Sequence, residues 1–175
     1  MTNPMVSISR PAPVDAQGAV SALYQQHWVG LLRLAVLMVD DRQAAEDVVQ
    51  EAFAELYRHW PLRASDAALT YLRTAVLNRS RSVLRRRKVA RLYIPPHQAP
   101  NASAESDAVL GEERSQVQQA LHALPRRTRE VLVLRYYLDL PFAEIAQTLG
   151  ISESSARATS SRGLAVLTER LKELR

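Results

Sequence analysis

Residues 124–174 are the most informative segment for the fold and read LPRRTREVLVLRYYLDLPFAEIAQTLGISESSARATSSRGLAVLTERLKEL. Residues 142–150 resemble the first helix of a helix-turn-helix with Gly150 at the turn, and Ser152 is expected to begin the second helix. Apolar residues recur at helical spacing and predict one shared core. Its expected members are Leu132, Ile145, Ala146, Leu149, Ile151, Ala156, Leu164, Leu167 and Leu171.

The second predicted helix exposes a face that fits the DNA major groove. Its candidate DNA-binding residues are Ser155, Arg157, Ala158, Ser161 and Arg162. Small residues permit a close approach to the groove, and an arginine can bind guanine N7 and O6 or a phosphate. An ordinary surface helix is the alternative interpretation of this face.

Upstream of this stretch the chain predicts helices and no strands. The first helix is expected to start at Asp15 or Ser21 and to end at Val39. Further helices are predicted over residues 42–58, 67–91, 116–124 and 126–137. Asp40 and Asp41 suit the start of the helix at 42–58 by capping and by helix dipole, and proline ends it at position 61. The fold class is therefore all-α.

Two small helical domains joined by a flexible linker are expected. Residues 1–17 form an N-terminal tail, and residues 18–92 form the first domain. Three prolines and many small residues between positions 93 and 111 indicate the linker. Residues 112–175 form the second domain, which contains the helix-turn-helix.

The first domain has one acidic and one basic helix. Residues 40–57 contain six acidic residues and one arginine, whereas residues 63–91 contain nine basic residues and one aspartate. Two faces of opposite charge predict two partners, of which one is a polyanion. Two solvated faces that balance one another are the alternative.

Particular residues stand out on each of these helices. Asp47, Gln50 and Glu51 share one face of the acidic helix, opposite its apolar stripe, and could dock on a basic partner. The basic helix contributes the candidates Arg73, Asn78, Arg79 and Arg81. Its arginines can neutralise phosphates, and Asn78 can bind a base edge. Tyr71 is either a stacking platform for an unpaired base or a core residue.

Several function classes find no support in the sequence. The chain of 175 residues has no cysteine, which excludes disulfides and cysteine-based zinc sites. Its four histidines lack metal-binding spacing, and no nucleophile or phosphate-loop motif occurs, so we expect no catalytic residues, no metal and no cofactor. No apolar run is long enough for a membrane span, and no secretory signal is evident. The formal net charge is +5. We expect a cytoplasmic protein.

These motifs together resemble the extracytoplasmic-function (ECF) group of bacterial sigma factors. The resemblance rests on AEDVVQEAF at positions 45–53, on the basic helix, and on the helix-turn-helix with EIAQTLGIS at 144–152. The arginine-rich segment NRSRSVLRRR at 78–87 is similar to an actinobacterial, sigma-E-like subgroup. The recognition helix departs from the usual Gly-Thr-Val-Lys-Ser, because it has Ser-Ser-Ala-Arg-Ala at positions 154–158.

The resemblance implies a non-enzymatic subunit that binds the β and β′ subunits of core RNA polymerase and promoter DNA, with an anti-sigma factor as a further candidate partner. It assigns Asp47, Gln50 and Glu51 to docking on the polymerase. It assigns Ser155, Arg157, Ala158, Ser161 and Arg162 to the −35 element. It assigns recognition of the −10 element to Arg63, Ala64, Ser65, Asp66, Ala67, Arg73, Asn78, Arg79 and Arg81.

A different class of protein remains as the alternative. A stand-alone helix-turn-helix regulator would bind duplex DNA as a dimer and would favour palindromic sites. Such a regulator gives no role to the acidic face at Asp47, Gln50 and Glu51, or to the separate basic helix.

Overall fold

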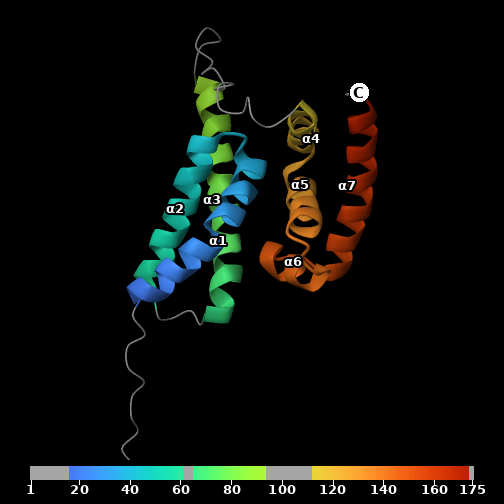
Figure 1. Cartoon of the computed structure of the whole chain (residues 1–175). Helices are drawn as coiled ribbons and strands as arrows, with labels where there is room; N and C mark the ends of the chain where they lie inside the picture. The colour runs from blue at the N-terminus through green and yellow to red at the C-terminus, as the bar shows by residue number, and fades with distance from the viewer. Residues whose placement is uncertain (1–15, 61–64, 94–111, 174–175) are drawn as a thin grey trace, which may run out of the picture.

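The all-α prediction is confirmed: the computed structural model describes residues 16–60, 65–93 and 112–173, and no strand occurs among them (Figure 1). Helices α1–α3 form one group, here called the N-terminal bundle. Helices α4–α7 form a second group beside it, the C-terminal bundle. The predicted linker lies outside the described residues, except that Tyr93 is the last residue of α3.

The N-terminal bundle consists of α1 (Ala16–Val39), α2 (Arg42–Arg58) and α3 (Ser65–Tyr93), which pack on one another. Its aliphatic core follows the predicted helical periodicity, with Leu34, Val49 and Leu72 fully buried at the centre. Asp41 caps α2 as expected, because its carboxylate accepts a hydrogen bond of 3.1 Å from the Ala44 N–H. Asp40 instead lies between the helices in a left-handed conformation, with φ of +56°.

The C-terminal bundle consists of α4 (Glu112–His122), α5 (Arg126–Leu132), the π-helical turn η1 (Val133–Tyr137), α6 (Phe142–Leu149) and α7 (Glu153–Glu173). The long helix α7 packs on α4, α5 and α6. Gly150 ends α6 in a left-handed conformation, with φ of +64°, and so makes the predicted turn. The helix-turn-helix is therefore present.

Some predicted boundaries differ from the structure. Helix α1 begins at Ala16, so the predicted tail is shorter than residues 1–17. Helix α3 begins at Ser65, two residues before its predicted start at position 67. Helix α7 begins at Glu153, because Ser152 caps it by accepting a hydrogen bond of 3.1 Å from the Ser155 N–H.

The helix predicted over residues 126–137 is not uniform. Its last turn is π-helical, and the Leu138 N–H donates to the Val133 carbonyl, five residues earlier. The predicted core position of Leu164 is wrong, since 40% of that residue is exposed. Gly163, one residue earlier, faces α5 instead. Because successive helical residues point about 100° apart, Leu164 is turned away from that contact.

The contact of α7 with α5 depends on the absence of a side chain at position 163. A Cβ there would overlap the Thr128 methyl group and would lie 3.3 Å from the Leu132 Cδ1. We expect Gly163→Ala to lower the melting temperature, because overpacking costs about 1–3 kcal/mol. The gain in helix propensity, about 1 kcal/mol, only partly offsets this cost.

Gly30→Ala is the matched control for thermal unfolding followed by circular dichroism. Gly30 lies inside α1, and a Cβ there would meet no atom within 4 Å. This substitution is expected to raise the melting temperature through helix propensity alone. An equal upward shift in both variants would show that the close approach at Gly163 is not needed.

The C-terminal bundle lies along the N-terminal bundle (Figure 1). Helix α4 contacts α1, and α6 contacts α3. Helix α5 lies between the N-terminal bundle and α7, which forms the outer side of the molecule. The basic helix α3 therefore lies beside the C-terminal bundle, whereas α7 lies on the side of that bundle away from α3.

Candidate functional site

The predicted DNA-binding face of α7 is exposed. Ser155, Arg157, Ala158, Ser161 and Arg162 are all exposed there. Ala156 and Ser160, on the opposite side of α7, are buried against the rest of the bundle. This division fixes the orientation of the helix, so the structure brings the five candidates together on one surface.

Arg157 is held in place by two neighbours. Its guanidinium donates a hydrogen bond of 2.5 Å to the Glu153 carboxylate, one turn earlier. The same group lies 4.7 Å from the centre of the Phe142 ring, a cation–π contact. An open groove of about 620 Å³ runs beside it and includes Tyr136 and Leu164 in its lining. Arg157 therefore lies at the edge of this groove, with 62% of its side chain exposed.

The acidic face of α2 is also on the surface. Asp47, Gln50 and Glu51 are exposed, as the helical spacing predicts. Asp47 accepts only a long hydrogen bond of 3.4 Å, from the Gln43 side chain. Glu51 is ion-paired with Arg79 of α3, so the structure brings one residue of the acidic face into contact with one of the basic helix.

The −10 candidates fall into two groups. Arg63 and Ala64 lie outside the described residues, and Ser65, Asp66 and Ala67 form the first turn of α3. The others, Arg73, Asn78, Arg79 and Arg81, follow one another along α3. They do not form a free cationic row, because all three arginines are paired with carboxylates.

Beside Arg79 the surface of α3 is hollowed. A depression of about 250 Å³ is lined by side chains of α2 and α3, among them Tyr71, Asn78 and Arg79. Arg79 donates a hydrogen bond of 2.7 Å to Glu55 at its edge. This ion pair lowers the pKa of Glu55 and keeps that carboxylate charged. Tyr71 is partly buried against the core, as one interpretation predicts, and it also lines the depression. Its stacking on a base stays a prediction.

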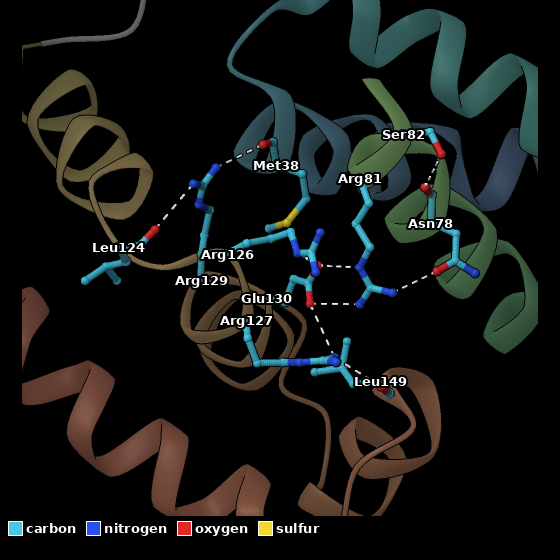
Figure 2. A network of polar contacts seen from close by, with 10 residues as sticks. All are labelled: Met38, Asn78, Arg81, Ser82, Leu124, Arg126, Arg127, Arg129, Glu130 and Leu149. Carbon is cyan, nitrogen blue, oxygen red and sulfur yellow. Dashed lines mark hydrogen bonds and ion pairs between the residues drawn. The ribbon is translucent and has the colours of Figure 1, made fainter. Parts of the chain in front are cut away.

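The central polar network joins the two bundles (Figure 2). Arg81 of α3 donates two hydrogen bonds, of 2.6 and 2.8 Å, to the two carboxylate oxygens of Glu130 in α5. Its remaining nitrogen donates to the Asn78 side chain at 2.8 Å. Arg126 and Arg127 lie 3.7 and 3.6 Å from the same carboxylate. Glu130 is 1% exposed, so this is a buried carboxylate surrounded by arginines from both bundles.

Arg129 makes the second connection between the bundles. Its guanidinium donates to the Met38 carbonyl at the end of α1, at 3.0 Å, and also to His122 in α4. Asp40 accepts a hydrogen bond of 3.1 Å from the Gln118 side chain and lies 3.7 Å from the His122 Nε2. Burial lowers the pKa of Arg129, although the nearby Asp40 and Glu130 partly oppose this.

Sequence reasoning missed Arg129 and Glu130 as residues with a particular role. Both are buried, although charged residues are usually exposed. One signal was available: Glu130 is the single acid in a segment with three arginines, at positions 126, 127 and 129. Such a segment needs partners for its charges.

His122 should make the contact between the bundles sensitive to pH. Burial, followed by the positive charge of Arg129, lowers the pKa of His122, while Asp40 and a hydrogen bond with the Val36 backbone oppose this. The neutral ring is thus favoured when the bundles are in contact. Its contribution to stability is complete above the ordinary pKa of about 6.5 and is lost as the pH falls below that value.

His122→Asn keeps an acceptor for Arg129 and removes the titration. We expect the melting temperature of the wild type to fall more between pH 7.5 and pH 5.5 than that of the variant. The other three histidines are identical in the two proteins, so the difference isolates His122. Parallel pH profiles would contradict this assignment.

Metal and membrane sites are not evident in what the structure describes. Within residues 16–60, 65–93 and 112–173, no group of three or more His, Cys, Asp or Glu side chains could hold a metal ion. None of the helices described here combines the length and apolar character needed to cross a membrane.

Family models match two parts of the chain. Sigma-70 region 2 matches residues 23–89, and Sigma-70 region 4 matches residues 114–167. The first match covers most of the N-terminal bundle, and the second covers the helix-turn-helix. The region 2 match contains the acidic helix α2 and most of the basic helix α3, and the region 4 match contains the exposed face of α7.

Whole-length relatives agree with these matches. The chain is 32% identical to the RNA polymerase sigma-E factor of Streptomyces avermitilis over 145 residues, which cover 81% of this chain and 78% of the relative. It is 28% identical to the ECF RNA polymerase sigma factor SigL of Mycobacterium tuberculosis, over 97% of this chain and 98% of the relative.

Solved structures show the same fold. CnrH, solved in complex with the cytosolic domain of CnrY, aligns with a TM-score of 0.67 at 25% identity, over 90% of this chain and 95% of CnrH. The sigma factor RpoE of Bartonella quintana, solved in complex with the anti-sigma factor NepR, aligns with a TM-score of 0.63 at 18% identity. That alignment covers 87% of this chain and 98% of RpoE.

Proposed function

The chain belongs to the ECF group of RNA polymerase sigma factors, and from that membership we propose how its surfaces divide the work of promoter recognition. As a sigma factor it binds core RNA polymerase and directs it to promoter DNA to begin transcription. The observation that supports the division is the separation of charge. An acidic face lies on α2, a basic helix follows as α3, and exposed arginines lie on α7.

The acidic face of α2 is the proposed docking surface for the polymerase. Asp47, Gln50 and Glu51 project from one side of a helix whose other side is locked into the core by Val48, Val49 and Phe53. A rigid, exposed row of acceptors suits a basic partner surface, because complementary charge favours the encounter and fixes the register.

Helix α3 is the proposed reader of the −10 element. Melting exposes unpaired bases, and proteins bind such bases by stacking and by hydrogen bonds to their edges. The depression beside Tyr71 and Asn78 offers both kinds of contact. Arg73, Arg79 and Arg81 are the proposed phosphate ligands, and residues 63–67 complete the proposed −10 surface.

Helix α7 is the proposed reader of the −35 duplex. Its exposed face places Arg157 and Arg162 among the small residues Ser155, Ala158 and Ser161. A helix with this surface can enter the major groove closely enough for bidentate contacts with guanine. The Ser154–Ala158 segment departs from the usual residues of the family, so the preferred −35 sequence should differ too.

The remaining assignments belong to the same proposal. We place the domain boundaries at residues 18–92 and 112–175, which the family matches at 23–89 and 114–167 support. The chain acts as a specificity subunit without catalysis of its own, in the cytoplasm where the polymerase works. An anti-sigma factor is a candidate partner, because the similar structure of RpoE was solved in complex with the anti-sigma factor NepR.

Run-off transcription with purified core polymerase tests this proposal. Genomic DNA fragments serve as templates, and transcript ends are mapped with and without the chain. Transcripts with defined starts that need both the chain and the polymerase are expected. Binding of palindromic duplexes by a dimer, with no stimulated transcript, would favour the stand-alone regulator instead.

A further inference from the structure

A contact between the two helices of the helix-turn-helix places the Arg157 side chain. The Arg157 guanidinium lies 4.7 Å from the centre of the Phe142 ring. Phe142 is the first residue of α6, whereas Arg157 begins the second turn of α7. Both side chains line the open groove of about 620 Å³ beside α7. An aromatic residue outside the proposed DNA-binding set is therefore in contact with one of its arginines.

The Phe142 ring is fixed by its own segment of the chain. Pro141 precedes it with φ of −65°, the value that the proline ring imposes. The Phe142 side chain is half-buried and packs against the core. Arg135 lies 5.0 Å from the same ring centre and donates a hydrogen bond of 3.0 Å to the Leu140 carbonyl. The ring is thus a firm surface on which a flexible arginine side chain can rest.

The two neighbours of Arg157 restrain it by different physical means. Glu153 accepts hydrogen bonds of 3.2 and 2.5 Å from the Nε and one terminal nitrogen of the guanidinium. Guanine N7 and O6 need such donors, so Glu153 and a guanine compete for them. The Phe142 ring attracts the positive charge and uses no N–H donor. Arg157 can consequently leave Glu153 for a base while it stays on the ring.

We propose that Phe142 is a positioning residue of the −35 reader, which directs Arg157 to one base pair by keeping its guanidinium on the ring when Glu153 releases it. This inference rests on the proposed function of α7. A guanidinium that is already oriented loses less side-chain freedom on binding, so its contact with the correct base contributes more to affinity.

The residue type at position 157 suits this arrangement. The guanidinium is planar, stacks on aromatic rings and offers paired donors, whereas lysine, the usual family residue at this position, is a compact point charge on a flexible stem. The departure of residues 154–158 from the usual family segment thus includes the residue that makes the ring contact. An arginine held by an aromatic ring should read the −35 element differently from a lysine.

Selection of DNA by the assembled holoenzyme tests the proposal. Core polymerase and the full chain are incubated with fragments of a mapped promoter whose −35 element is randomised, and the bound fragments are sequenced. The enrichment of each base gives the discrimination at each base pair. Arg157→Lys identifies the pair that Arg157 reads, because we expect discrimination there to fall on the order of tenfold.

Phe142→Leu keeps an apolar side chain and removes the aromatic face. We expect it to lower discrimination at the same base pair by about 2–5-fold, which corresponds to about 0.5–1 kcal/mol for an exposed cation–π contact. Preferences at the other pairs should not change, and Phe142→Tyr, which keeps the ring, should behave as the wild type. Tyr137→Leu is the matched control, because it makes an aromatic-to-leucine change at an exposed position outside the groove lining.

Glu153→Gln separates the two neighbours of Arg157 without touching the half-buried ring. Glu153 is exposed, so this variant should fold normally. If the ring positions Arg157, Glu153→Gln keeps at least the wild-type discrimination at the Arg157 base pair. Loss of that preference would transfer the positioning role to Glu153 and overturn the inference, even if Phe142→Leu were too unstable to assay.

The outcomes separate this inference from the proposed function. If Arg157→Lys changes no base preference, the proposed role of Arg157 fails, and the positioning role of Phe142 fails with it. If Arg157→Lys changes one pair and folded Phe142→Leu leaves that pair unchanged, only the positioning role is overturned. A uniform loss of affinity in Phe142→Leu, with every preference kept, would make the ring a structural residue.

Discussion

Replacing Arg157 and Arg162 together by alanine is expected to lower transcription from −35-dependent promoters by about 10–100-fold. Both side chains are exposed on the outer face of α7. A good bidentate contact with guanine contributes about 1–3 kcal/mol of discrimination, and every 1.4 kcal/mol is about tenfold. Because neither residue is buried, the fold should survive the change.

The measurement is quantitative run-off transcription beside a pull-down of core polymerase. Polymerase association should be unchanged, since the acidic face of α2 is intact. Arg170→Ala/Lys172→Ala is the matched control, because it removes the same two charges from exposed positions near the end of α7. Wild-type transcription by the double variant would remove α7 from −35 recognition.

Arg157 also has a specific local restraint that can be released. Its pairing with Glu153 and its contact with Phe142 hold the guanidinium along the helix surface. Binding to guanine must compete with Glu153, whereas the ring can support the side chain in either position. If Arg157 binds guanine as proposed, this restraint contributes to the energetics of −35 binding.

Reversing the charge at Asp47 is expected to reduce affinity for core polymerase on the order of 100-fold. Asp47 is exposed on α2 and accepts one long hydrogen bond, so Asp47→Arg should leave the melting temperature close to that of the wild type. Placing like charges across an interface costs several kcal/mol, and this accounts for the size of the effect.

Competition binding with labelled wild-type chain gives the affinity. Glu173→Arg is the matched control, since it makes the same reversal at an exposed position at the far end of α7. The Asp47→Arg variant should still bind a −35 duplex. Unchanged polymerase affinity, together with a wild-type melting curve, would contradict the docking role of this face.

The helices could be predicted from the sequence because their apolar periodicity is local. Leu34, Val49 and Leu72 are buried where the spacing placed them, and Asp41 caps α2 as its side chain suggests. Gly150 adopts the left-handed turn that the helix-turn-helix requires. These features depend on residues a few positions apart, so one stretch of sequence determines each of them.

The pairing between bundles could not be predicted in the same way. Arg81 and Glu130 are 49 residues apart, and helical periodicity specifies a face but not its distant partner. Arg79, a candidate DNA contact, pairs with Glu51 and Glu55 of α2. A carboxylate can hold an arginine in the free protein at a position where a phosphate binds later, and the sequence alone does not separate these two uses.

As a sigma factor, this chain should enable core polymerase to open promoter DNA. Permanganate oxidation of unpaired thymines measures this opening most directly, on a promoter identified by mapped transcripts. We expect reactive thymines at the −10 element only when both the chain and core polymerase are present. Protection of a duplex by the chain alone, with no reactive thymine in the presence of polymerase, would contradict it.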